Sequence, residues 1–227
     1  MKRLFLALSI PEAMSKSFED YLHIYRNDQH FQDAKWTGPE NLHITVFFLG
    51  EVTESHLLEM RSILRGVAGR MTPFTLHFER VEFFAHKMPK MIWGRFQRNL
   101  GFLELNQECK KFMKPYLDMT KEEEMKEPIP HVTLARLRKP VDPKHFSFQP
   151  LNLPSVEATE LHLYESVLTP QGPSYTLIES YRLGVQGRID GPFVTGARLA
   201  ISFLLRLDPT KFLQHFGCRQ VHFENLQ

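Results

Sequence analysis

The chain has 227 residues, of which 42% are hydrophobic and 24% charged, as is typical of a folded globular protein with a substantial core. Its 28 basic and 26 acidic side chains leave a formal net charge of only +2, which argues against broad electrostatic binding of long nucleic acids. A local basic site remains compatible with that charge. The two cysteines, Cys109 and Cys218, fit no metal-ligand spacing, so we expect both to be reduced and structural.

Hydrophobic periodicity predicts strands alternating with helices. Pro11 suits a first helical turn, and Thr53 and Asn99 are expected N-caps of two later helices. In chain order we expect a strand at 4–9, a helix at 11–26, a strand at 41–50, a helix at 53–68, strands at 74–84 and 91–96, a helix from 99 that ends before 117, and strands at 130–137, 156–165 and 175–183.

The apolar run at residues 4–10 ends at Pro11 and lacks a small-residue cleavage pattern, so we expect a buried strand there rather than a signal peptide. A later apolar run at 197–207 is too short to span a bilayer. We therefore expect a cytoplasmic protein without a membrane partner, and we expect it to be a monomer. Periodicity weakens beyond residue 184, which predicts a domain at 1–184 and a C-terminal extension of unknown role at 185–227.

A short pattern occurs twice, 88 residues apart. NLHITV at residues 41–46 and IPHVTL at 129–134 both read His, apolar, Thr, apolar at the start of an expected strand. One His-x-Thr triplet is weak evidence, and an isolated strand histidine is more often structural. Two copies with matching apolar positions are improbable by chance, and no third copy exists.

Strand geometry explains why this spacing matters. Side chains alternate between the two faces of a strand, so His43 and Thr45 point one way while their apolar neighbours point into the core. The same rule puts His131 and Thr133 together. Two such strands facing each other would supply two imidazoles and two hydroxyls to one small site.

That set of groups suits displacement at phosphorus. At neutral pH one imidazole can accept a proton from water while another, protonated, donates to the leaving oxygen. Nucleophile and leaving group occupy opposite sides of the phosphorus, and hydroxyl or guanidinium donors stabilise the remaining oxygens. The pattern requires neither a metal nor a cofactor, and the other histidines show no zinc-ligand spacing.

At these residues the sequence resembles the 2H phosphoesterases, and within them the RNA 2′,3′-cyclic phosphodiesterases, also called 2′-5′ RNA ligases. The resemblance runs from about residue 2 to residue 184. It rests on RLFLAL at 3–8, Trp36, PENLHITVFFLG at 39–50, MIWG at 91–94, PHVTLAR at 130–136 and LYES at 163–166.

The resemblance implies an α+β fold in which two pseudo-symmetric lobes of antiparallel sheet and helices surround a central cleft. It implies hydrolysis of RNA 2′,3′-cyclic phosphate ends to 2′-phosphates, with reversible 2′-5′ joining of tRNA halves in some members. By this analogy His43 is the general acid and His131 the general base. Thr45, Thr133 and Arg136 would hold the phosphate, and Phe48 would stack on the terminal base.

Simple geometry conflicts with two of these roles. Phe48 and Arg136 each follow their histidine by five residues, an odd offset that turns a side chain to the opposite face of a regular strand. A bulge, or exit from the strand into a loop, is needed to bring them to the cleft. Without one, Phe48 is a core residue and Arg136 belongs to a solvated basic strand end with Arg138 and Lys139. Trp36 and Trp93 are expected to serve packing.

Two alternatives remain open at this point. The same chemistry could act on 2′-5′-linked oligonucleotides or small cyclic nucleotides instead of RNA ends. A module that binds RNA or nucleotides without turnover is a third hypothesis, although binding alone does not require two proton-transfer groups.

Overall fold

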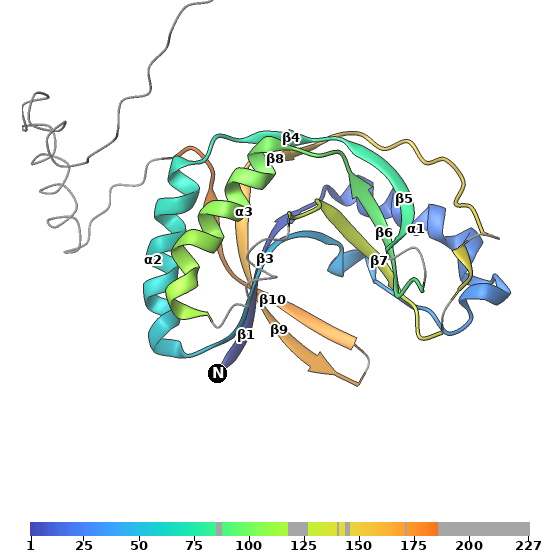
Figure 1. The fold of residues 1–227 in the computed structure, drawn as a ribbon, viewed down its shortest axis with the longest axis horizontal. Coiled ribbons are helices and arrows are strands. Elements are labelled where there is room, and N and C mark those ends of the chain that lie inside the picture. The colour runs from blue at the N-terminus through green and yellow to red at the C-terminus, as the bar shows by residue number, and fades with distance from the viewer. Residues whose placement is uncertain (85–87, 118–126, 140, 144–145, 171, 186–227) are drawn as a thin grey trace, which may run out of the picture. The chain divides into compact units, whose positions relative to one another are not determined.

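The structure is a computed structural model that describes residues 1–84, 88–117, 127–139, 141–143, 146–170 and 172–185. An eight-stranded antiparallel sheet runs in the order β10-β9-β1-β3-β7-β6-β5, and β2 pairs with the end of β7 (Figure 1). Its strands are β1 (Lys2–Ser9), β2 (Lys35–Trp36), β3 (His43–Val52), β5 (Phe78–Phe84), β6 (Met91–Phe96), β7 (His131–Arg136), β9 (Glu160–Thr169) and β10 (Gly172–Arg182). A separate pair joins β4 (Phe74–Leu76) to β8 (Val156–Ala158).

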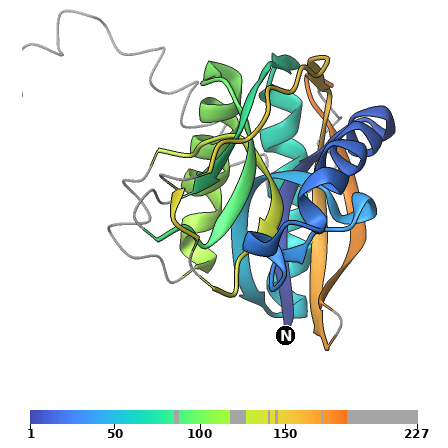
Figure 2. The ribbon, with the colours of Figure 1, turned by 90° about the vertical axis from the view of Figure 1, so that its right-hand side faces the viewer.

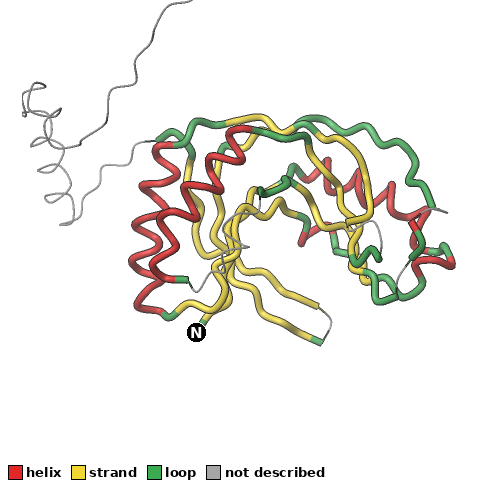
Figure 3. Tube along the Cα trace, viewed as in Figure 1, coloured by secondary structure: helices red, strands yellow, loops and turns green. Residues whose placement is uncertain are grey.

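Helices cover the two ends of the main sheet. The helices α2 (Glu54–Arg70) and α3 (Leu100–Met113) lie side by side against one end, and α1 (Glu12–Arg26) lies against the other (Figures 1 and 3). Short 3₁₀ helices occupy Gln29–Phe31, Pro39–Asn41 and Lys114–Tyr116. The expected α+β architecture with two lobes of antiparallel sheet is therefore confirmed.

The helix starts follow from capping chemistry. Thr53 accepts a hydrogen bond from the backbone N–H of His56 at 3.4 Å, as predicted. Asn99 accepts from the backbone N–H of Phe102 at 3.0 Å and donates from its amide to the carbonyl of Thr75 at 2.8 Å. The second cap therefore also ties α3 to the strand pair β4–β8.

Close packing fixes α1 against the half of the sheet that contains β5 and β6. Phe18 of α1 is fully buried and meets Phe78 of β5 edge-on, with ring centroids 5.7 Å apart. A side chain at Gly94 of β6 would lie 2.9 Å from the Phe18 ring, so only glycine permits this approach. Cys109 of α3 is buried without a disulfide, and burial raises the pKa of its thiol to about 12. This agrees with a structural role, whereas Cys218 lies outside the described residues.

Two segments that were each predicted to be one strand are divided into two strands in the structure. Residues 74–84 divide at His77 into β4 and β5, and residues 156–165 divide at Thr159 into β8 and β9. The reason is that the halves have different partners: β4 and β8 pair with each other, whereas β5 joins β6 and β9 joins β1. The short strand β2 was not predicted.

The bulge that Phe48 requires in order to share a face with His43 is present in β3. Ala7 pairs with Thr45 and Leu6 pairs with Phe47, so Val46 is an extra residue in the strand. Val46 and Phe47 are consequently both buried, and Phe48 is 65% exposed on the face of His43 and Thr45.

A matching bulge occurs in β7. Trp93 pairs with Thr133 and Ile92 pairs with Ala135, which leaves Leu134 as the extra residue. Leu134 and Ala135 are both buried, and Arg136 is exposed. Both bulges fall three residues after their histidine, so the two motifs share one backbone irregularity as well as one sequence.

The domain boundary predicted after residue 184 stays a prediction, because nearly all of 185–227 lies outside the described residues. Within the described part of the chain, no helix has both the length and the apolar character needed to cross a lipid bilayer.

A buried amide supports the bulge of β3. Asn106 of α3 is almost fully buried and donates its side-chain N–H to the carbonyl of Val46 at 2.6 Å. We expect Asn106→Ala to lower the free energy of unfolding by about 1–3 kcal/mol, because it leaves a buried carbonyl without its donor. Urea denaturation measures this change. The neighbouring exposed Gln107→Ala is the matched control, and equal stability of the two variants would contradict the assignment.

Candidate active site

The two His-x-Thr motifs lie on directly paired strands. Ile44 of β3 pairs with Val132 of β7, and both side chains are fully buried. The flanking histidines and threonines are half-buried and project from the other face of the sheet. Continuing the antiparallel register places His43 opposite Thr133, and His131 opposite Thr45.

Each imidazole is held by a hydrogen bond of the same kind, to the backbone carbonyl two residues earlier in the chain. The Nδ1 atom of His43 lies 2.7 Å from the carbonyl of Asn41, and the Nδ1 atom of His131 lies 2.7 Å from the carbonyl of Ile129. A carbonyl only accepts, so Nδ1 carries the proton in each ring. The Nε2 atom of each histidine is thereby the one left to exchange a proton with a ligand.

An aromatic stack backs His131. The Trp93 indole lies parallel to the imidazole, with centroids 3.6 Å apart and planes inclined by 17°, and Phe84 stacks on the far side of Trp93 at 3.8 Å. The pKa of His131 is lowered to about 4, chiefly by burial and in addition by the charges of His43 and Arg136, while the hydrogen bond to Ile129 opposes the shift. His131 is therefore neutral at physiological pH.

The environment of His43 is aromatic but looser. Phe5 lies 4.9 Å from the His43 ring at 35°, and Tyr175 meets that ring edge-on at 5.1 Å. Tyr164 stacks on Phe5 at 5.3 Å. Burial lowers the pKa of His43, opposed by the hydrogen bond to Asn41.

Thr45 and Thr133 present their hydroxyls on the same face. Neither hydroxyl has a hydrogen-bond partner among the described residues. A half-buried hydroxyl without a partner is available to a ligand. These two groups therefore lie beside the imidazoles as unengaged donors.

The bulges turn Phe48 and Arg136 to the histidine face, which the sequence left open. Phe48 lies 6.2 Å from Phe5 between ring centroids. Arg136 contacts the Met91 sulfur at 3.5 Å and has no ion-pair partner within the described residues. All six residues predicted for the site consequently share one face of the sheet.

Sequence reasoning missed the aromatic groups around the histidines. Trp93 was expected to serve packing; it is buried, but the ring that it packs against is His131. Phe5 and Tyr164 lie in stretches that carry the resemblance but were given no role, and Tyr175 was not singled out. Alternation along a strand shows which residues share a face with each of these rings. Only the pairing register of β1, β9 and β10 shows that the rings lie on the same face of the sheet as His43.

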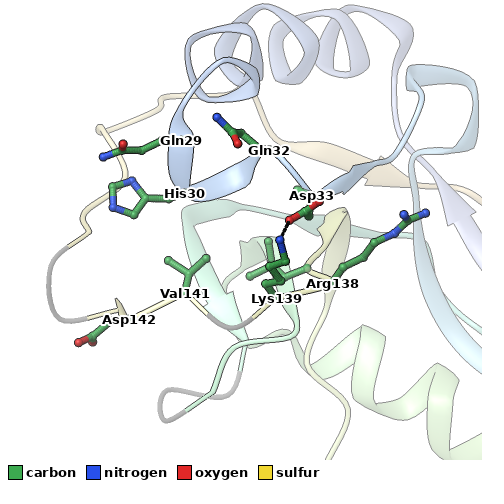
Figure 4. Close-up of a pocket in the computed structure, with 10 residues that line it drawn as sticks. Gln29, His30, Gln32, Asp33, Arg138, Lys139, Val141 and Asp142 are labelled. Carbon is green, nitrogen blue, oxygen red and sulfur yellow. Dashed lines mark ion pairs between the residues drawn. The ribbon is translucent and has the colours of Figure 1, made fainter.

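Two hollows lie apart from these residues. One, of about 280 Å³, is lined by Gln29, His30 and Val141 among others, and its Lys139 pairs with Asp33 at 2.5 Å while Arg138 extends away (Figure 4). The other, of about 480 Å³, borders β5. Among the described residues no three His, Cys, Asp or Glu side chains gather as metal ligands. Independence from metals rests on the two-histidine chemistry and stays a prediction.

The stack on His131 makes its protonation observable. An imidazolium held against an indole quenches its fluorescence, and Trp36→Phe leaves Trp93 as the sole tryptophan. Because the pKa of His131 is lowered to about 4, we expect quenching to begin well below pH 6.5, with a midpoint near 4. Adding His131→Ala should abolish the transition. Circular dichroism on the same samples verifies folding, and a midpoint near 6.5 would contradict the described environment.

The family model for LigT-like phosphoesterases matches residues 8–93, which include the first motif. The RNA 2′,3′-cyclic phosphodiesterase of Thermus thermophilus is 30% identical over 196 residues, covering 82% of this chain and 93% of that protein. The protein of the same name from Methanocaldococcus jannaschii is 29% identical over 188 residues, covering 79% and 99%.

A solved structure agrees with these matches. The crystal structure of TT0787 from Thermus thermophilus superimposes with a TM-score of 0.67 at 25% identity, covering 82% of this chain and all of that one. The sequence matches extend beyond the second motif, and the structural match includes both lobes. The chain therefore belongs to the family of LigT-like phosphoesterases, the 2H phosphoesterases.

Proposed function

We propose that this protein is an RNA 2′,3′-cyclic phosphodiesterase that opens cyclic phosphate ends to 2′-phosphates without a metal ion. The observation that carries the proposal is the pair of identically held imidazoles on directly paired strands. Relatives that share 27–30% of their residues with this chain bear the same activity in their names. The other phosphodiesterase substrates considered above have no comparable support.

The reaction is an in-line displacement. Water attacks phosphorus while the bond from phosphorus to O3′ breaks, so the two oxygens lie on opposite sides of the phosphorus. His131 takes the proton from water, and His43 gives a proton to the departing O3′. The phosphate stays on O2′, and the two histidines exchange their protonation states in each turnover.

The surroundings of the two rings support this division of roles. His131 is the more strongly shifted toward its neutral form, which a base requires, with its pKa lowered to about 4. Burial also lowers the pKa of His43, but a bound phosphate adds a negative charge beside it. An adjacent anion favours the protonated imidazole, so substrate binding prepares His43 as the acid.

The remaining groups bind substrate. Thr45 and Thr133 donate hydrogen bonds to the non-bridging oxygens, and Arg136 supplies the compensating charge. Phe48 is 65% exposed, and a ring exposed beside the reacting group offers a stacking surface to the terminal base. A 5′-hydroxyl that attacks in place of water gives 2′-5′ joining with the same histidine roles, because O3′ is again the leaving oxygen. In the reverse of either reaction O3′ attacks phosphorus and the two histidines exchange roles.

Product analysis tests the proposed function. We expect an oligonucleotide ending in a 2′,3′-cyclic phosphate to yield a 2′-phosphate end, because the departing oxygen is O3′. Activity should persist in excess EDTA. Phosphorus-31 NMR distinguishes the two product isomers. A 3′-phosphate product, or activity restored only by a divalent cation, would overturn the proposal.

Replacement of either histidine tests the roles separately. We expect His43→Ala and His131→Ala each to lower kcat by about 10²–10⁴-fold, since each removes a positioned proton-transfer group. A substrate with sulfur in place of the bridging O3′ should restore His43→Ala selectively, because a thiolate, with a thiol pKa of about 8.5, leaves without a proton. Stopped assays with both substrates measure the effect. Rescue of His131→Ala instead would reverse the assignment.

A further inference from the structure

The hairpin of β9 and β10 forms an apolar wall beside His43. Tyr175 of β10 contacts both Phe5 and His43, so the hairpin face that carries it is the face of the active site. Leu177 follows Tyr175 by two residues and pairs with Tyr164, which also contacts Phe5, so Leu177 points the same way. It is 49% exposed, although it adjoins the reaction site. Figures 1 and 2 show the hairpin projecting away from β4 and β8.

A lysine reaches this wall from the opposite lobe. Lys35 of β2 pairs with Arg136 of β7, and paired residues project from the same face of a sheet. The Lys35 side chain ends at the start of β10, where a Cβ on Gly172 would lie 2.9 Å from its Nζ atom. Gly172 has a φ of 142°, which glycine adopts without strain. The ammonium group thus lies between the Arg136 strand and the hairpin.

This part of the site carries uncompensated positive charge. Neither Lys35 nor Arg136 has a carboxylate partner among the described residues. Several other cations on the same sheet are paired, as Arg95 is with Glu79 and Glu82. Burial raises the pKa of Tyr175, and the charges of Arg136 and Arg3 oppose that rise, so both guanidinium groups act on this wall.

Two cations from adjacent strands suit two phosphates in sequence. If Arg136 holds the reacting phosphate, Lys35 is placed for the phosphodiester that links the terminal nucleotide to the preceding one. The Tyr175 ring and the exposed Leu177 offer an apolar surface on the same face of β10, three and five residues along the strand from Gly172. A base of single-stranded RNA binds such surfaces by stacking and apolar contact.

We infer that Lys35 and the β9–β10 hairpin form a subsite for the second nucleotide of an RNA chain, with Lys35 on its phosphodiester and Leu177 against its base. The inference rests on the proposed function, because it names the substrate as an RNA chain end rather than a mononucleotide. It predicts that affinity grows in two separable steps, one for the additional phosphate and one for the additional base.

Three ligands resolve these steps by calorimetry without turnover. They are a nucleoside 2′-phosphate, the corresponding nucleoside 2′,5′-bisphosphate, and a dinucleotide that ends in a 2′-phosphate. For the unaltered protein we expect several-fold tighter binding from the first ligand to the second. From the second to the third we expect on the order of tenfold, the usual size of one stacked base.

The variants assign each step to its residue. Lys35→Ala should remove the gain from the additional phosphate, whereas Lys35→Arg should retain it because the charge remains. Leu177→Ser should remove the gain from the additional base. Val167→Ser is the matched control, because Val167 is 50% exposed on the opposite face of the same hairpin and should retain both gains.

The inference is overturned if the unaltered protein binds the three ligands equally, binds none of them, or keeps either gain after the corresponding substitution. Because no step requires turnover, these results are separate from the fate of the proposed reaction. A 3′-phosphate product in the hydrolysis assay would reject the proposed reaction, whereas the affinities for the three ligands would still test the subsite.

Discussion

One backbone pair, Ile44 with Val132, places the two lobes in register. Beyond this pair, β3 is hydrogen-bonded to β1, whereas β7 is hydrogen-bonded to β6 and to β2. Burial of both side chains in the core obliges the histidines and threonines on either side to face the opposite surface. A shift of this register by one residue would turn one histidine and its threonine to the buried face and separate them from the other motif.

The lobes match in backbone but differ in side chains. Phe5 and Ala7 of β1 pair with Phe48 and Thr45, as Met91 and Trp93 of β6 pair with Arg136 and Thr133. The two bulges keep this correspondence intact. Where β1 and β3 place Ala7 and Phe48, β6 and β7 place Trp93 and Arg136, so the side chains beside the two motifs differ in size and charge. Similar backbones thereby place the two histidines in different surroundings.

The sequence predicted the parts that local chemistry determines. Both motifs, the caps at Thr53 and Asn99, and the need for a bulge before Phe48 and Arg136 follow from spacing and side-chain chemistry. The division of two strands at His77 and Thr159 did not, because it depends on partners distant in the sequence. The same holds for Trp93 on His131 and Lys35 at the hairpin, since register between distant strands leaves no local signal.

The central claim is that two imidazoles serve opposite sides of one phosphorus atom. A crystal structure with a bound nucleoside vanadate tests it most directly, because vanadium copies the trigonal bipyramidal geometry of in-line displacement. We expect the Nε2 atoms of His43 and His131 to lie within hydrogen-bonding distance of the two apical oxygens, one each. A complex in which either ring contacts only an equatorial oxygen, or turns away from the vanadate, would contradict it.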